Sequence, residues 1–145
     1  MTILYEKVTI IGLGLIGASI ALATRRAGVA GQITGCDSGD NIADEIASLK
    51  LVDNFVADAG DAVSDADLVI MAVPVGALGA LSAEIIPKMK AGAVLTDTGS
   101  TKRSVMRDVA PNVAPHIHWL PSHPIAGTER SGPLAGHDTL FDDRY

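Results

Sequence analysis

The sequence is poor in cysteine and in aromatic residues, and each shortage narrows the possibilities. A single cysteine, Cys36, cannot form an internal disulfide, and it excludes a metal site built from a cysteine cluster. This usage is typical of the reducing cytosol, so we expect a cytoplasmic protein. Aromatic residues make up only 3% of the chain, so Val, Ile, Leu and Ala must build the core. That aliphatic bias favours a buried parallel sheet over an antiparallel sandwich.

Positive charge is also scarce. Lys and Arg number 11 against 17 Asp and Glu, and no basic stripe is available to follow the phosphates of a nucleic acid. One uncharged run, Val8–Thr24, has the hydropathy of a signal peptide or a short membrane span. Three glycines interrupt it, however, and Glu6 beside Lys7 places negative charge where a signal peptide requires positive charge. We therefore expect neither a nucleic acid nor a membrane as partner.

Short apolar runs alternate with segments of helical period along the 145 residues, which suffice for one domain. Strands are predicted at Ile3–Ile11, Gln32–Asp37, Asn54–Ala57, Leu68–Val73, Ala93–Asp97 and Ile117–Leu120. Helices are predicted at Leu15–Ala27, with Gly28 as its C-terminal cap, at Asn41–Lys50, at Gly76–Met89 and from about Ser100, and a long loop at Pro121–Gly136. This order predicts an α/β fold with a doubly wound, mainly parallel sheet, the Rossmann fold.

A glycine-rich turn, GLGLIG, connects the first predicted strand to the first predicted helix. Gly12 permits a tight turn, Gly14 allows a pyrophosphate to approach the backbone, and Gly17 allows close packing of helix and strand. Leu15 and Ile16 open the helix, where N–H groups without intrahelical partners attract phosphate. The alternative is a tight turn that binds nothing. The context of strand, turn and helix favours a dinucleotide site over that alternative.

Asp37 follows the second predicted strand, twenty residues beyond the last glycine of the turn. A carboxylate at this place can bind the two ribose hydroxyls of a dinucleotide, although it could also be an ordinary surface acid. Ser38–Asp40 supply no cation for the 2′-phosphate of NADP, so we expect NAD as the cofactor. This preference holds unless Arg25 or Arg26 reaches across from the first helix.

The ends of the later strands carry the remaining candidates, because ligands of this fold bind beyond the carboxyl ends of the strands. Val73 and Pro74 follow the fourth strand and are expected to contact the cofactor. His123 follows the sixth strand, and the ordinary pKa of histidine suits it for acid–base catalysis, unless it is simply a solvated loop residue. Ser100 follows the fifth strand and is expected to cap the next helix, a role compatible with ligand contact.

Several other polar residues are expected to be structural. Asp97 should bind loop amides at the end of its strand, Lys102 should be solvated on a helix, and Cys36 should be a small buried apolar side chain. His116 and His118 share one face of a strand and could form half of a metal site. No third ligand lies at a suitable spacing, so no metal is expected.

Three spaced motifs resemble the prephenate/arogenate dehydrogenase family of tyrosine biosynthesis. They are IIGLGLIGASIA around the glycine turn, DTGSTK at Asp97–Lys102, and HPIAGTERSG at His123–Gly132. Many dehydrogenases share the first motif, whereas the other two at this separation are specific. The resemblance spans Val8–Tyr145, and it departs mildly at Thr98 and Thr101, where valine is more usual in the family.

The resemblance implies an NAD-dependent oxidoreductase. Its expected reaction is oxidative decarboxylation of prephenate to 4-hydroxyphenylpyruvate, of arogenate to tyrosine, or of both. It further implies that His123 accepts the proton of the ring hydroxyl. Ser100 matches a serine near the nicotinamide and the same hydroxyl, and Thr128 and Glu129 match positions that line the substrate pocket.

The family also carries a helical second domain that dimerises and completes the substrate site, and nothing in this sequence encodes it. We therefore expect residues 1–145 to be a dinucleotide-binding domain truncated at its C-terminal end. It would belong to a longer, homodimeric enzyme, and alone it should bind NAD without turnover. One alternative is another dehydrogenase, such as a 3-hydroxyacid dehydrogenase, which leaves HPIAGTE unexplained. A non-catalytic dinucleotide-binding module is a second alternative, although such a module has no use for His123 and Ser100.

Overall fold

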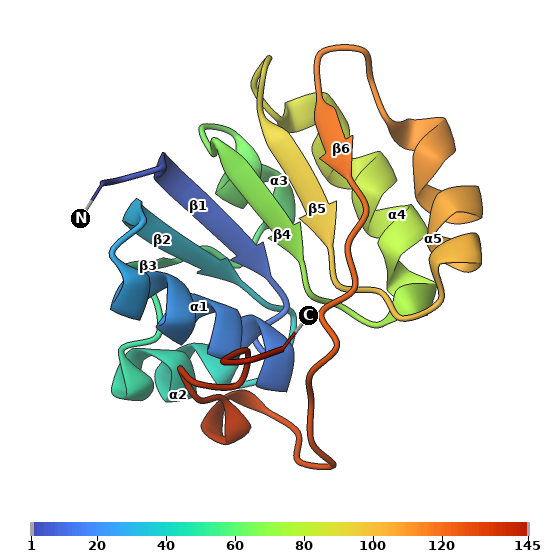
Figure 1. Ribbon diagram of the computed structural model, residues 1–145. Coiled ribbons are helices and arrows are strands. Elements are labelled where there is room, and N and C mark those ends of the chain that lie inside the picture. Colours follow the sequence, from blue (N-terminus) through green and yellow to red (C-terminus); the bar gives the residue numbers. More distant parts are fainter. Residues whose placement is uncertain (1, 145) are drawn as a thin grey trace.

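The fold is built on one parallel sheet of six strands, seen in a computed structural model that describes residues 2–144 (Figure 1). The strands lie in the order β3-β2-β1-β4-β5-β6. Their bounds are β1 Tyr5–Ile11, β2 Ala30–Cys36, β3 Asn54–Phe55, β4 Leu68–Met71, β5 Val94–Asp97 and β6 His118–Leu120. Every adjacent pair is parallel. Tyr145, the last residue of the family resemblance, lies outside the described residues.

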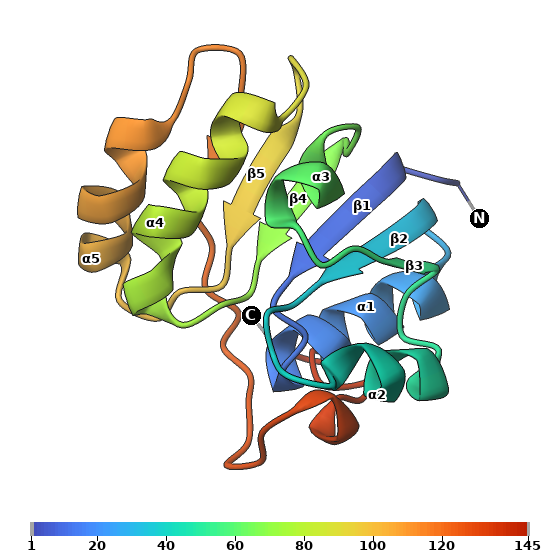
Figure 2. The ribbon, with the colours of Figure 1, turned by 180° about the vertical axis from the view of Figure 1, so that it is seen from behind.

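Helices cover both faces of the sheet. Their bounds are α1 Leu15–Ala27, α2 Ile42–Leu49, α3 Ala59–Val63, α4 Val75–Ile85 and α5 Lys102–Val109, with short 3-10 turns at Ile86–Lys88, Ala110–Asn112 and Pro133–Ala135. α1 and α2 lie on one face, and α3, α4 and α5 on the other (Figures 1 and 2). The predicted doubly wound α/β fold is confirmed.

Two aliphatic layers hold the helices against the sheet, as the shortage of aromatic residues predicted. Ile10 and Ile46 belong to the layer under α1 and α2, whereas Val69, Leu78 and Leu95 belong to the layer under α3, α4 and α5. All five side chains are fully or almost fully buried. Burying each contributes about 1.5–3 kcal/mol, so the two layers fix the sheet as a rigid base for its loops.

Several predicted element bounds are shifted in the structure. β1 begins at Tyr5 instead of Ile3, and β2 spans Ala30–Cys36 instead of Gln32–Asp37. α4 begins at Val75 and ends at Ile85, after which a 3-10 turn replaces the predicted continuation to Met89. Pro87, which cannot continue an α-helical hydrogen-bond ladder, accounts for that early end. The predicted bounds of α1 are confirmed, and Gly28 caps it in the left-handed conformation at φ 62°.

One local element was missed and one local prediction is wrong. No helix was predicted at the position of α3, whose five residues are too few to show a helical period. Ser100 was expected to cap the fifth helix, but α5 begins at Lys102 and the capping position belongs to Thr101, which makes no side-chain capping bond. The chain turns sharply after β5, and that turn takes up Thr98–Thr101 before the helix can start.

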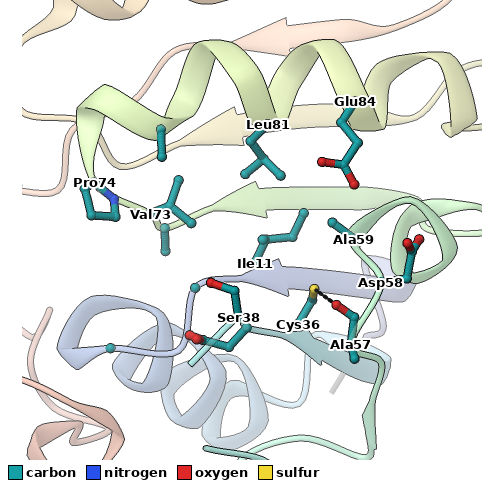
Figure 3. Close-up of a pocket in the computed structure, with 15 residues that line it drawn as sticks. Ile11, Cys36, Ser38, Ala57, Asp58, Ala59, Val73, Pro74, Leu81 and Glu84 are labelled. Carbon is teal, nitrogen blue, oxygen red and sulfur yellow. Dashed lines mark hydrogen bonds between the residues drawn. The ribbon is translucent and has the colours of Figure 1, made fainter. Parts of the chain in front are cut away.

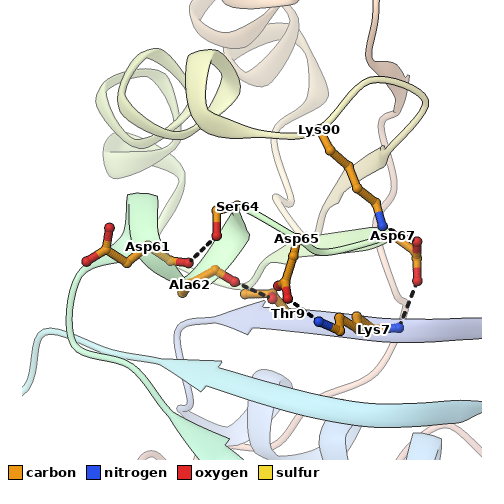
Figure 4. Close-up of polar contacts among 8 residues, drawn as sticks. All are labelled: Lys7, Thr9, Asp61, Ala62, Ser64, Asp65, Asp67 and Lys90. Atoms are coloured by element: carbon orange, nitrogen blue, oxygen red, sulfur yellow. Dashed lines mark hydrogen bonds and ion pairs between the residues drawn. The ribbon is translucent and has the colours of Figure 1, made fainter.

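Polar contacts fasten the amino-terminal edge of the sheet, opposite the edge formed by the carboxyl ends of the strands (Figure 4). The Lys7 amide donates to Asp67 Oδ2 over 2.8 Å, and Lys90 Nζ donates to Asp67 Oδ1 over 2.5 Å. Hydrogen bonds from Lys90 and Lys7 hold the pKa of Asp67 below its usual range. The buried Thr9 hydroxyl donates to the Ala62 carbonyl of α3 over 2.7 Å. These contacts tie β1, β4 and α3 together.

The carboxyl ends of four strands lie level with one another. Ile11 pairs with both Cys36 and Met71, and Met71 pairs with Asp97. The loops that follow these residues therefore start side by side at one edge of the sheet. This register places the glycine turn next to the loops after β2 and β4.

The segment after β6 leaves the same edge and folds back onto α1 (Figure 1). The His137 amide donates to the Ser19 hydroxyl over 3.0 Å, and Arg26 on α1 pairs with Asp142 over 2.5 Å. Within residues 2–144, no helix has the length and apolar character needed to cross a membrane.

Candidate functional site

The glycine turn has the geometry that its sequence predicted. Gly12 has φ +90°, and a Cβ there would lie 2.4 Å from the Ala72 carbonyl oxygen. A Cβ on Gly17 would lie 1.8 Å from the Gly12 carbonyl oxygen, so helix and turn could not pack so closely with a larger residue. A Cβ on Gly14 would meet nothing within 4 Å. The turn therefore presents bare backbone at Gly14, as the approach of a pyrophosphate requires.

Leu15 and Ile16 form the first helical turn beside it. The Leu15 side chain is buried and Ile16 is half-buried, and neither residue lines the cavity beside Gly14. The first turn contains no acidic residue that would repel a phosphate. The positive end of the α1 dipole thus points toward the cavity beside Gly14.

Asp37 stands beside the glycine turn and holds it in place. One carboxylate oxygen accepts from the Leu13 amide over 2.7 Å, and the other accepts from the Gly39 amide over 2.8 Å. The side chain is half-buried, and the residue lines the same cavity as Gly12 and Gly14. Each carboxylate oxygen has a further lone pair, so Asp37 can also accept from a ligand hydroxyl. The bond to Leu13 is a second role that the sequence did not reveal.

A cavity of about 540 Å³ opens beside the turn (Figure 3). Val73 and Pro74, which the sequence predicted to contact the cofactor, line one end. Leu81 and Glu84 project toward it from α4, and Asp58 lies at the end away from Pro74. Sequence reasoning did not identify these last three residues. Leu81 and Glu84 share one helical face, so their spacing was a usable signal.

The described residues that line this cavity supply negative but no positive charge. Its acidic residues are Asp37, Asp58 and Glu84, and no Lys or Arg is among the described residues that line it. Arg25 and Arg26 lie in the last turn of α1 and are engaged there. Arg25 pairs with Asp53 over 3.0 Å, and Arg26 pairs with Asp142. Neither arginine therefore reaches Asp37, and the condition placed on the expected preference for NAD does not apply.

Cys36 lies on the floor of the cavity as a buried, protonated thiol. Its residue is 3% exposed, and Sγ donates to the Ala57 carbonyl over 3.6 Å (Figure 3). Burial, followed by the charges of Asp37, Asp58 and Glu84, raises the pKa of the thiol to about 11. The expectation of a small buried apolar side chain is confirmed.

His123 lies in a second cavity, of about 360 Å³, at the ends of β5 and β6. Asp97, Thr98 and Ser122 line it as well. The His123 residue is exposed, so a ligand in this cavity can reach its ring. This cavity brings His123 together with the first two residues of the DTGSTK motif.

Asp97 anchors the turn after β5, as expected. Its side chain is fully buried, and Oδ2 accepts from the Gly99 amide over 2.8 Å and also from Lys102 Nζ. The expectation that Lys102 is simply solvated is wrong, because helix α5 begins at Lys102 and directs it back over the strand end. Within residues 2–144, Asp97 Oδ1 is buried and has no hydrogen-bond partner.

The other predicted site residues lie outside these two cavities. Ser100 is exposed on the turn between β5 and α5. Thr128 lines a third cavity, of about 450 Å³, together with Arg144. Glu129 is exposed and lines none of the three cavities. Among residues 2–144, no group of three His, Cys, Asp or Glu side chains could hold a metal ion. His116 and His118 therefore belong to no such group in the described part of the chain.

A parallel sheet in this strand order, with a glycine turn after β1 and an acid after β2, defines a nucleotide-binding domain of the Rossmann class. Comparison with known proteins identifies the family. Residues 20–145 match the family model described as the nucleotide-binding domain of prephenate dehydrogenase. The chain belongs to the prephenate dehydrogenase family.

Curated relatives agree with this assignment. The chain is 43% identical over 139 residues to the cyclohexadienyl dehydrogenase of Zymomonas mobilis, covering 96% of this chain and 47% of that protein. It is 32% identical over 142 residues to the prephenate dehydrogenase of Bacillus subtilis, covering 97% of this chain and 38% of that protein. The chain therefore spans less than half the length of either relative.

Solved structures share the fold. A prephenate dehydrogenase of Aquifex aeolicus, in complex with hydroxyphenyl propionate and NAD+, matches with a TM-score of 0.86 and 27% identity, over 96% of this chain and 48% of that one. An arogenate dehydrogenase of Synechocystis matches with a TM-score of 0.85 and 25% identity, over 96% of this chain and 48% of that one.

Proposed function

We propose that this chain binds NAD and serves as the cofactor-binding part of a prephenate or arogenate dehydrogenase of tyrosine biosynthesis. The observation that carries the proposal is the level edge formed by the strand ends. It sets the glycine turn and Asp37 at one end and His123 at the other, in a chain of this family. A dinucleotide laid along that edge would have its phosphates at Gly14 and a ribose at Asp37. Val73 and Pro74 would contact it between the two ends.

NAD, when bound, supplies the acceptor for a hydride from the ring carbon that bears the substrate hydroxyl. His123 accepts the proton of that hydroxyl, so the carbon–oxygen bond becomes a carbonyl as the hydride leaves. The carbonyl is conjugated with the two ring double bonds that flank the carbon bearing the ring carboxylate. The electron pair of the bond to that carboxylate therefore passes to the carbonyl oxygen as carbon dioxide departs, and the ring becomes an aromatic phenol when this oxygen takes up a proton. The general base is worth roughly 10²–10⁴-fold in rate.

Ser100, Thr128 and Glu129 complete the part of the substrate site that this chain offers. Ser100 is proposed to contact the substrate hydroxyl from the turn after β5, next to the nicotinamide. Thr128 and Glu129, in the loop after β6, are proposed to line the substrate pocket. All three residues are exposed and therefore accessible to a ligand and to residues outside the given sequence.

We further propose that a second domain, outside the given sequence, closes the site in a cytoplasmic homodimer. The substrate carries two carboxylates, each of which needs a fixed cation or a set of donors. Arg25 and Arg26 are already paired at the far end of α1. Arg130 is the one arginine in the His123–Gly132 motif and cannot bind two separate carboxylates. A further domain would supply the missing donors and exclude water.

The proposal is tested by assaying the full-length protein that contains this chain. Prephenate, arogenate and a 3-hydroxyacid are each supplied with NAD or NADP, and formation of reduced nicotinamide is followed by absorbance. We expect turnover of prephenate, arogenate or both, with NAD preferred. Turnover of the 3-hydroxyacid alone would contradict the proposal, and so would NAD binding without turnover of any cyclohexadienyl substrate.

A further inference from the structure

The cavity beside the glycine turn has an acidic end whose two carboxylates differ in their contacts. Asp58 is already engaged, because its Oδ1 accepts from the Asp61 amide over 2.8 Å and lies 3.7 Å from Lys88 Nζ. The Glu84 carboxylate forms no hydrogen bond or ion pair with any described residue. It points from α4 toward the cavity (Figure 3). Glu84 is therefore the carboxylate at this end that has no competing partner among the described residues.

The surface leading to Glu84 is apolar and suits a flat ring. Ala57 and Ala59 line one side of the cavity, and Ala77 and Leu81 line the side formed by α4. Residues four apart on a helix lie above one another, and Glu84 follows Leu81 by three, so it continues the same face. A planar ring held between these walls would present its edge to the Glu84 carboxylate.

The position of the ring follows from the proposed function, on which this inference rests. With the phosphates at Gly14 and a ribose at Asp37, the base of the dinucleotide extends away from Pro74 and toward Asp58 and Glu84. Adenine carries an exocyclic amino group, which is a hydrogen-bond donor. An ionised carboxylate only accepts hydrogen bonds. We propose that Glu84 is a specificity residue that accepts a hydrogen bond from the exocyclic amino group of the adenine ring.

The three carboxylates of this cavity act on one another's surroundings, because all of them line it. Asp37, Asp58 and Glu84 each raise the pKa of the Cys36 thiol on the cavity floor. The negative potential that they create favours a base edge that carries a donor and disfavours one that carries a carbonyl oxygen. Nicotinamide hypoxanthine dinucleotide differs from NAD in this respect, because hypoxanthine has a carbonyl oxygen where adenine has the amino group.

The test compares the dissociation constants of NAD and nicotinamide hypoxanthine dinucleotide by calorimetry. The parent chain is expected to bind NAD about tenfold more tightly, because the carbonyl would face a carboxylate that cannot donate. In Glu84→Gln this ratio should fall to near unity, because an amide can donate to the carbonyl or accept from the amino group. Glu45→Gln makes the same change on α2, outside the cavity, and should keep the parental ratio.

The outcomes separate this inference from the proposed function. A ratio near unity in the parent, or a parental ratio in Glu84→Gln, would overturn the role of Glu84 while NAD binding stands. Asp58→Asn keeps an acceptor oxygen for the Asp61 amide, so it should fold normally and keep the ratio. Loss of the ratio in that variant, with Glu84→Gln unaffected, would assign the contact to Asp58 instead. Failure of either dinucleotide to bind the parent would overturn the proposed function together with this inference.

Discussion

Replacing Asp37 by serine is expected to weaken NAD binding and to raise the relative affinity for NADP. The Asp37 carboxylate lies between the glycine turn and the cavity, where it accepts from the Leu13 and Gly39 amides over 2.7 and 2.8 Å. Its remaining lone pairs are available to the ribose hydroxyls. A serine side chain is too short to make all of these contacts and carries no charge.

The expected loss of NAD affinity follows from the charge and the exposure of the Asp37 carboxylate. A hydrogen bond to a charged group contributes about 1.5–3 kcal/mol, and the lower figure suits this half-buried carboxylate. The loss then corresponds to about a tenfold weaker NAD complex. A phosphate charge about 4 Å from the Asp37 carboxylate would be repelled by about 1 kcal/mol in water and about 4 kcal/mol at an effective dielectric of 20. Because no described cation lines the cavity, the substitution should relieve that repulsion.

Calorimetric titration of the parent and variant chains with NAD and NADP measures both effects. Asp40→Ser removes the same charge from an exposed position in the same turn and should leave both dissociation constants unchanged. A melting curve for each variant shows whether loss of the Leu13 contact has unfolded the turn. An unchanged NAD dissociation constant in a folded Asp37→Ser chain would refute the placement of the ribose.

Four further predictions concern the turn, the thiol and the reaction. In the full-length protein, His123→Asn should lower kcat by roughly 10²–10⁴-fold with NAD affinity unchanged, whereas His116→Asn should behave as the parent. Near-parental turnover in His123→Asn would exclude His123 as the base. Gly17→Ala should lower the Tm and weaken NAD binding, because its Cβ would lie 1.8 Å from a carbonyl oxygen of the turn, while Gly76→Ala, with open space at its Cβ, should not. The pKa of the Cys36 thiol is raised from 9.0 to about 11, so the protonated thiol stabilises the folded state fully below pH 9, and this stabilisation is lost as the pH rises through 11. Rapid alkylation of Cys36 in the folded chain at neutral pH would contradict the raised pKa. The 145-residue chain alone should form no reduced nicotinamide from prephenate, and turnover at an ordinary enzymatic rate would contradict the need for a second domain.

The sequence predicted those features that depend on local chemistry. The apolar period and the glycine signal determine α1 and its left-handed cap at Gly28, and both agree with the structure. Gly12 and Gly17 were assigned to a tight turn and to close packing, and the space around each residue agrees with its assignment. These properties concern neighbouring backbone atoms, so a short stretch of sequence is enough to predict them.

Features that depend on distant contacts were not predictable. Ser19 and His137 meet through the folding back of the chain after β6, and no local pattern links them. Lys102 pairs with Asp97 only because α5 starts later than its sequence indicated. Leu81 and Glu84 could have been found, since they share one face of α4, the helix that starts at the edge where ligands of this fold bind.

The central claim, that the level edge of the sheet holds NAD, is tested most directly by titrating this chain with NAD in a calorimeter. The account predicts saturable binding at one site per chain. It also predicts weaker binding of NADP, because Asp37, Asp58 and Glu84 line the cavity and no described Lys or Arg lines it. Absence of saturable NAD binding by the folded chain, or tighter binding of NADP than of NAD, would contradict the account.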